Sequence, residues 1–142
     1  MTRRELIDLC LALPHTYEDY PFDEVADANA TTVMRHRANK KSFALIMRHK
    51  EQLYLNLKCE PMEADFLRQV YEGVMPGYHM NKTHWNTVVI GSDVPESAMR
   101  MMIERSYALT KPKVRKGMAV DWRNENTAHH QKPMEPKGRT AR

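Results

Sequence analysis

The chain has 142 residues, of which 42% are hydrophobic and 28% are charged. This size suits one domain with a sizeable core, and no apolar run approaches the roughly 20 residues that a membrane helix needs. The first residues are charged rather than apolar, so no signal peptide is expected. The sequence therefore predicts a cytoplasmic protein with no membrane partner, in which Cys10 and Cys59 stay reduced.

Charge is distributed unevenly along the chain. The formal net charge is +4, but nine Lys and Arg against three Asp and Glu lie from residue 111 onward. Residues 1–110 then hold 13 basic and 15 acidic side chains, a net charge of −2. Because residues 111–142 also lack apolar periodicity, we predict a folded domain over 1–110 and a basic, disordered tail over 111–142.

Helical and then strand periodicity mark the N-terminal half. Thr2-x-x-Glu5 is a capping box that begins a helix predicted to end near Leu13. The acidic and aromatic residues 15–27 predict a surface loop, anchored by aromatic side chains that include Phe22. Alternating apolar residues then predict three antiparallel strands joined by short turns, over residues 31–37, 42–49 and 52–58.

The same alternation assigns side chains to faces of the sheet. In residues 42–49 the pattern predicts one apolar face made by Phe43, Leu45 and Met47. In residues 52–58 it places Leu53, Leu55 and Leu57 on one face and Tyr54, Asn56 and Lys58 on the other.

The C-terminal half begins with a helix opened by Pro61, whose apolar positions are Phe66, Leu67 and Val70. Residues 73–81 predict a loop and residues 85–90 a strand. Asp93-x-x-Glu96 predicts a second capping box, followed by an amphipathic helix that ends near Thr110. The whole pattern predicts an α/β domain of the α+β type, with a central antiparallel sheet and flanking N- and C-terminal helices.

Four stretches and a Ser106-Tyr107 pair together resemble a known family. The stretches are Ala12–Phe22, Lys41–Leu45, Leu55–Pro61 and Pro76–Val88. They are similar to the MmcQ/YjbR family of small bacterial proteins over about residues 1–110. The resemblance implies a YjbR/CyaY-like fold, also similar to secretion chaperones, and a proposed double-wing role in DNA binding, with no reaction common to the family. One departure is the basic turn over residues 37–42, which lacks the glycines usual there.

The most specific segment within this resemblance is also the richest in polar and aromatic side chains. As a binding surface, Lys82 would take a phosphate or carboxylate, Tyr78 and Trp85 would stack on a base, and the other side chains would donate hydrogen bonds. The alternative is structural: Asn81 caps a turn, Trp85 fills the core and Lys82 is solvated. The candidate ligand-binding residues are Tyr78, His79, Asn81, Lys82, His84 and Trp85.

Basic residues gather around the two predicted hairpin turns. On the wings of a DNA-binding domain they would contact the phosphate backbone. The alternative is a sheet edge that Lys and Arg keep from aggregating. The candidate nucleic-acid-binding residues are Arg35, Arg37, Lys40, Lys41, Arg48 and Lys50, together with Lys82.

No motif indicates catalysis or a cofactor. The chain has no glycine-rich phosphate loop, no nucleophile elbow and no Cys-x-x-Cys. His79 and His84 are five residues apart and have no partner motif, so no metal site is predicted. The leading hypothesis is a non-enzymatic DNA-binding domain, and the alternative is a module that binds a small molecule or a protein partner.

Overall fold

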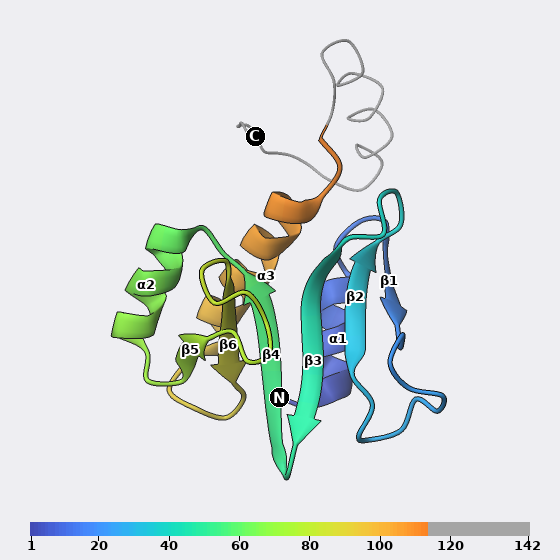
Figure 1. Ribbon diagram of the computed structural model, residues 1–142, viewed down its shortest axis with the longest axis horizontal. Helices are drawn as coiled ribbons and strands as arrows, with labels where there is room; N and C mark the ends of the chain where they lie inside the picture. Colours follow the sequence, from blue (N-terminus) through green and yellow to red (C-terminus); the bar gives the residue numbers. More distant parts are fainter. Residues whose placement is uncertain (114–142) are drawn as a thin grey trace. The chain divides into compact units, whose positions relative to one another are not determined.

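In the structure, a computed structural model that describes residues 1–113, helices separate groups of consecutive strands (Figure 1). Met1–Lys111 form one compact unit. The tail predicted over residues 111–142 lies almost wholly outside the described residues. The elements of the described part are α1 (Arg3–Leu11), β1 (Thr16–Asp19), β2 (Thr32–His36), β3 (Ser42–His49), β4 (Gln52–Lys58), α2 (Pro61–Val70), β5 (Val74–Pro76), β6 (Trp85–Val89) and α3 (Glu96–Thr110).

All six of these strands belong to one antiparallel sheet, in the order β1-β2-β3-β4-β6-β5. The first four strands form a meander, in which each strand pairs with the next one along the chain. β6 then pairs with β4, and the short β5 is added outside it. The predicted antiparallel sheet with flanking helices is therefore confirmed.

The hydrophobic core lies between one face of the sheet and the three helices. Directly opposed residues in neighbouring strands share a face, and the pairs Ile46–Leu55 and Leu55–Val88 fix which face is covered. The helices contribute to the same core cluster through Leu6 of α1, Leu67 of α2 and Met102 of α3. In Figure 1 the helices α1 and α3 lie behind the sheet.

Local chemistry explains where two of the helices begin. The predicted capping box of α1 is present, since the Thr2 side chain accepts from the backbone N–H of Glu5 and the Glu5 carboxylate accepts from that of Thr2. Pro61 occupies the first position of α2, where no backbone N–H is needed. The second predicted capping box is wrong: Pro95 is the N-cap of α3, and Asp93 instead accepts from the backbone N–H groups of Glu72 and Gly73 at 2.9 and 2.7 Å.

The predicted face of β3 is only partly right: Leu45 and Met47 share a face, opposite Asn56 and Tyr54, but it is the face away from the helices and Phe43 does not lie on it. Ala44 and Ile46 point to the helices, opposite Leu57 and Leu55, so Leu45 lies on the other face. Phe43 reaches the helix side next to a register irregularity between β2 and β3. A central strand that is buried on both faces reads as a continuous apolar run, and its alternation then identifies no face.

Two predicted loops contain short strands. β1 lies within the predicted loop 15–27, and β5 lies within the predicted loop 73–81. Phe22, expected to anchor the first loop, is 71% exposed. Phe66 and Val70 are also exposed, because α2 buries Ala64 and Leu67 instead. Among the described residues no helix is long and apolar enough to cross a bilayer.

Candidate nucleic-acid interface

Within residues 1–113, one face of the sheet carries no helix, and we call it the helix-free face (Figure 1). The strand register places three charged side chains on it: Asp19 of β1, Arg35 of β2 and Lys58 of β4. Arg35 pairs with Asp19 at 2.8 Å, which neutralises both. Lys58 forms no ion pair within residues 1–113, so it gives the strands a net positive charge on this face.

Four aromatic rings meet on the helix-free face, and we call them the Tyr78 cluster. The Tyr78 ring lies 6.4 Å from the ring of Tyr54 on β4, with an angle of 26° between the planes. It also lies 6.0 Å from His49 at the end of β3 and 4.0 Å from His79. Tyr78 is 37% exposed and no helix covers it. The structure therefore joins two candidate ligand-binding residues to two strand residues.

The loop over residues 77–84 is held against this face by buried polar groups. The backbone N–H of Tyr78 donates to the Thr87 hydroxyl at 2.8 Å, and that hydroxyl donates to the Asn56 side chain at 2.5 Å. Gly77 allows the close approach, because a Cβ at this position would lie 2.8 Å from the Cβ of Trp85. The position of Tyr78 is thus fixed by the sheet beneath it.

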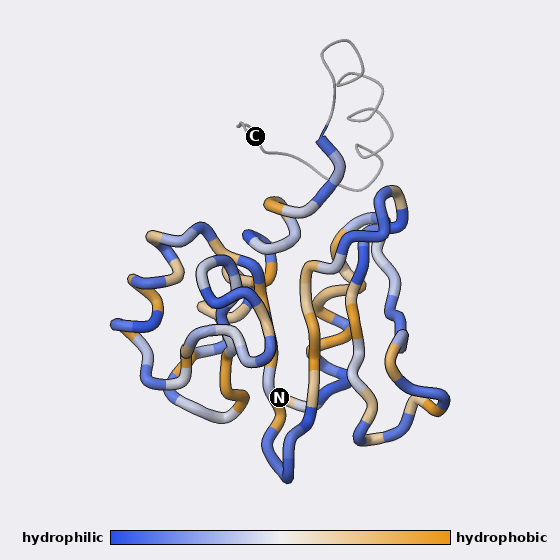
Figure 2. Tube along the Cα trace, in the orientation of Figure 1, coloured by the Kyte–Doolittle hydropathy of each residue, from blue (hydrophilic) through white to orange (hydrophobic). Residues whose placement is uncertain are grey.

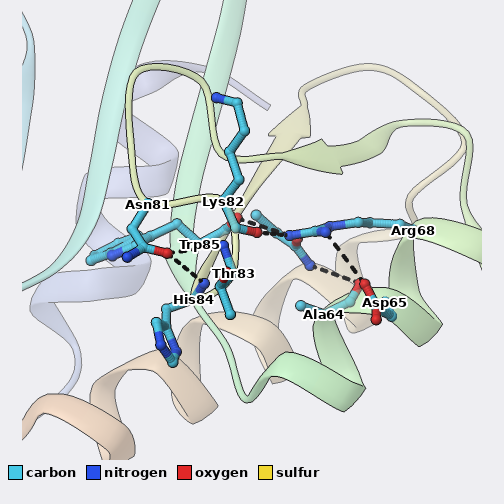
Figure 3. Close-up of polar contacts among 9 residues, drawn as sticks. Ala64, Asp65, Arg68, Asn81, Lys82, Thr83, His84 and Trp85 are labelled. Carbon is cyan, nitrogen blue, oxygen red and sulfur yellow. Dashed lines mark hydrogen bonds and ion pairs between the residues drawn. The ribbon is translucent and has the colours of Figure 1, made fainter.

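Arg68 of α2 organises the turn over residues 81–86 (Figure 3). Its guanidinium donates to the Asn86 side chain at 2.7 Å and to the backbone carbonyls of Lys82 and Trp85. Within the turn, the Asn81 side chain accepts from the backbone N–H groups of Thr83 and His84. This agrees with the structural alternative, in which Asn81 caps a turn. The turn is therefore attached to α2 by a planar donor that can reach several oxygens at once.

The remaining candidate ligand-binding residues do not form one cluster. In Figure 3 the side chains of Lys82 and His84 point to opposite sides of the turn. The Lys82 ammonium donates to the backbone carbonyl of Gly77 at 2.9 Å, across the same loop as Tyr78. His84 is exposed, and Trp85 is half-buried. Lys82 thus belongs with the Tyr78 cluster, whereas His84 does not.

The two hairpin turns that carry candidate nucleic-acid-binding residues lie at opposite ends of β3. Lys40 and Lys41 precede β3, and Lys50 follows it. Both turns are hydrophilic in Figure 2. Eight residues of β3 separate them, which is roughly 26 Å of extended chain. Lys40 and Lys50 both have left-handed backbone, with φ of 61° and 57°.

The three candidate arginines are each engaged within the fold. Arg35 forms the ion pair described above and also donates to the backbone carbonyl of Lys40. Arg37 lies over the Tyr17 ring at 5.6 Å. Arg48 points to the helix side of the sheet, opposite Leu53, and donates to the carbonyl of Glu51 at 3.3 Å. These arginines therefore lie near the hairpin turns, but their guanidinium groups already contact partners within the fold.

Residues 1–113 offer little support for a reactive thiol, a metal site or a sizeable ligand pocket. Burial raises the pKa of Cys10 to about 12 and also raises the pKa of Cys59, so neither thiol is activated as a nucleophile. No group of three or more His, Cys, Asp and Glu side chains within residues 1–113 could hold a metal ion. The pocket between α2, α3 and β4, lined in part by Cys59 and Arg105, has room for no more than about one water molecule.

Sequence reasoning missed two residues of this interface, Tyr54 and Arg68. A signal was present for Tyr54, which alternates with the buried leucines of β4 and must therefore face away from them. No local signal pointed to Arg68, because its partners lie 14 to 18 residues away in the chain.

The architecture of residues 1–113 defines an α+β protein, in which the described helices cover one face of a six-stranded antiparallel sheet. The chain belongs to the YjbR family, whose model matches residues 11–109. It is 36% identical over 121 residues to the uncharacterized protein YyaQ of Bacillus subtilis, covering 78% of this chain and 99% of that protein. It is 30% identical over 107 residues to the uncharacterized protein YjbR of Escherichia coli K12, covering 75% and 85% of the two chains.

Solved structures share this fold. A crystal structure of a Deinococcus radiodurans protein superimposes with a TM-score of 0.70 at 32% identity, covering 84% of this chain and 86% of that one. A crystal structure of a Pseudomonas syringae protein gives a TM-score of 0.68 at 30% identity, covering 78% and 100%. The family resemblance seen in the sequence is therefore confirmed, together with the α+β fold that it implied.

Proposed function

We propose that this protein is a non-enzymatic DNA-binding domain, and that lysines of the two hairpin turns and the helix-free face contact the phosphate backbone. One observation carries the proposal. All six ion pairs within residues 1–113 use an arginine. The lysines that form no ion pair with these residues include Lys40, Lys41, Lys50, Lys58 and Lys82.

Unpaired lysines suit phosphate contacts for a physical reason. A lysine that needs no carboxylate can approach a phosphate without first breaking an ion pair, and each such contact releases counterions from the nucleic acid. Local charge decides such binding more than net charge does. The net charge of −2 over residues 1–110 is therefore compatible with a basic binding surface.

The proposal is tested by removing charge at the two hairpin turns. Lys40→Asn with Lys50→Asn removes two cations and keeps residues that tolerate the left-handed backbone at both positions. Binding of the full chain to labelled single-stranded and duplex DNA is measured by anisotropy across a salt series. We expect the slope of log Kd against log salt to fall by about 2 if both lysines contact phosphates.

A matched control removes the same charge elsewhere. Arg4→Gln with Arg100→Gln neutralises two exposed helical arginines that already pair with carboxylates. Equal changes in slope for the two double variants would mean that the hairpin lysines are not phosphate contacts. Absence of binding to either DNA, together with thermal stabilisation by a metabolite, would favour the alternative module that binds a small molecule.

A further inference from the structure

We propose that the nucleic acid recognised by the helix-free face is single-stranded, and that its unpaired bases stack on the Tyr78 cluster. This inference rests on the proposed function and names the form of its ligand. The observation behind it is an exposed group of aromatic rings, next to unpaired lysines, on a sheet face without helices.

The cluster offers a ring in a fixed position. Tyr54 lies in the middle of β4, opposite Met47 on one side and Val89 on the other, so two strand ladders hold it. Tyr78 is held by the donation of its backbone N–H to Thr87 at 2.8 Å. Rings that are already ordered lose little entropy when a ligand binds. Stacking on such a ring contributes about 5- to 150-fold in affinity per base, and it tolerates any base.

Cations flank the cluster in the way that a single strand requires. Lys50 follows His49 directly in the turn after β3, and Lys82 lies in the same loop as Tyr78. Lys58 lies four residues beyond Tyr54 on the same face of β4, roughly 13 Å away. Proteins that bind single strands combine stacking rings with a row of cations along the backbone, over sites of about four nucleotides or more.

A duplex fits the same geometry poorly. Its bases are paired and stacked on each other, so an exposed tyrosine ring on a sheet has no free base face to contact. The two basic hairpin turns lie at opposite ends of β3 and point away from each other (Figure 1). They therefore cannot enter the grooves of one straight duplex together, whereas a flexible strand can pass along the face between them.

The test measures binding of the full chain to three labelled probes: a 12-nucleotide oligo-dT, a 12-nucleotide oligo-U and a 12-base-pair DNA duplex. We expect at least about 10-fold tighter binding to one of the single strands than to the duplex. Tyr78→Leu should weaken single-strand binding by about 5-fold or more and leave duplex binding unchanged, while Tyr78→Phe keeps the parent affinity. The preference between oligo-dT and oligo-U identifies whether DNA or RNA supplies the unpaired bases.

The control is Phe66→Leu, which removes an exposed ring from α2 instead. It should not change any of the three affinities. Residues 114–142 are identical in every variant, so they cannot produce a dependence on Tyr78. Equal affinity for duplex and single strands, or no effect of Tyr78→Leu, would overturn the single-strand inference while the proposed function stands. Absence of binding to all three probes, or binding to oligo-U alone, would overturn the proposed function itself.

Discussion

His36, the last residue of β2, shows how a single side chain depends on its packing. It is 2% exposed and its ring lies 5.1 Å from Phe43 and 4.7 Å from Tyr107. Its Nε2 is 2.7 Å from the Thr110 hydroxyl, which also contacts the backbone carbonyl of Ser106 at 2.8 Å. Burial lowers the pKa of His36 to about 4, helped by the charges of Lys111 and Lys41.

The lowered pKa predicts a loss of stability in mild acid. The unfolded chain protonates His36 near pH 6.5 and the folded chain only near pH 4, so the contribution is complete above pH 6.5 and is lost as the pH falls toward 4. A shift of this size is worth roughly 3 kcal/mol. Urea unfolding between pH 7 and pH 4.5 should show this decline in the parent and a flatter profile for His36→Gln.

Carboxylates whose pKa is lowered in the fold, such as Asp93, lose their contribution at still lower pH. The pH range in which these carboxylates lower the stability therefore overlaps little with the range of His36, between pH 6.5 and pH 4. His49→Gln makes the same change at an exposed histidine and should keep the profile of the parent. A parent-like decline in His36→Gln would show that another group causes the acid sensitivity.

At the scale of elements, the attachment of α2 to the turn over residues 81–86 depends on Arg68. Arg68→Ala removes the donor for two backbone carbonyls and for the side chain of Asn86, which is 1% exposed. Because a buried acceptor then loses a charged partner, we expect a loss of about 2 kcal/mol in the free energy of unfolding. Urea unfolding followed by far-UV circular dichroism measures it.

The control for this prediction is Arg100→Ala, which breaks an exposed ion pair with Glu96 within α3. Such pairs contribute little, so the change should stay within about 0.5 kcal/mol. Similar losses in both variants would show that Arg68 acts only as another surface cation.

The elements that the sequence failed to predict share a physical property. β1 and β5 are strands of four and three residues that lie at the two edges of the sheet. An edge strand pairs on one side only and needs little apolar surface, so its sequence carries no clear alternation. The longer strands were found because they carry more apolar residues: β4 has leucines that alternate toward the helices, and β3 is buried on both faces.

At the scale of the whole molecule, charge is divided between the domain and the residues that follow it. Removing residues 114–142 takes away seven Lys and Arg and three Asp and Glu. The compact unit Met1–Lys111 holds the Tyr78 cluster and the five unpaired lysines. A chain that ends at Lys113 should therefore bind oligo-dT with a shallower salt slope and the same loss of affinity on Tyr78→Leu.

The measurement is the anisotropy titration across salt, with the parent and Tyr78→Leu in both chain lengths. Loss of all binding in the shortened chain would assign nucleic-acid binding to residues 114–142 rather than to the domain. The cytoplasmic location and the disorder of residues 114–142 stay predictions from the sequence.

The sequence by itself determined the α+β class, the four inner strands, the three helices and the family, because burial against a helix layer leaves a periodic pattern in the sequence. It also pointed to the segment from Tyr78 to Trp85. Only the tertiary structure decided which of those residues act together, because their contacts are with side chains that lie far away in the sequence. The β4 ladder brings Tyr54 to Tyr78, Arg68 holds the turn, and β3 separates the two basic hairpin turns.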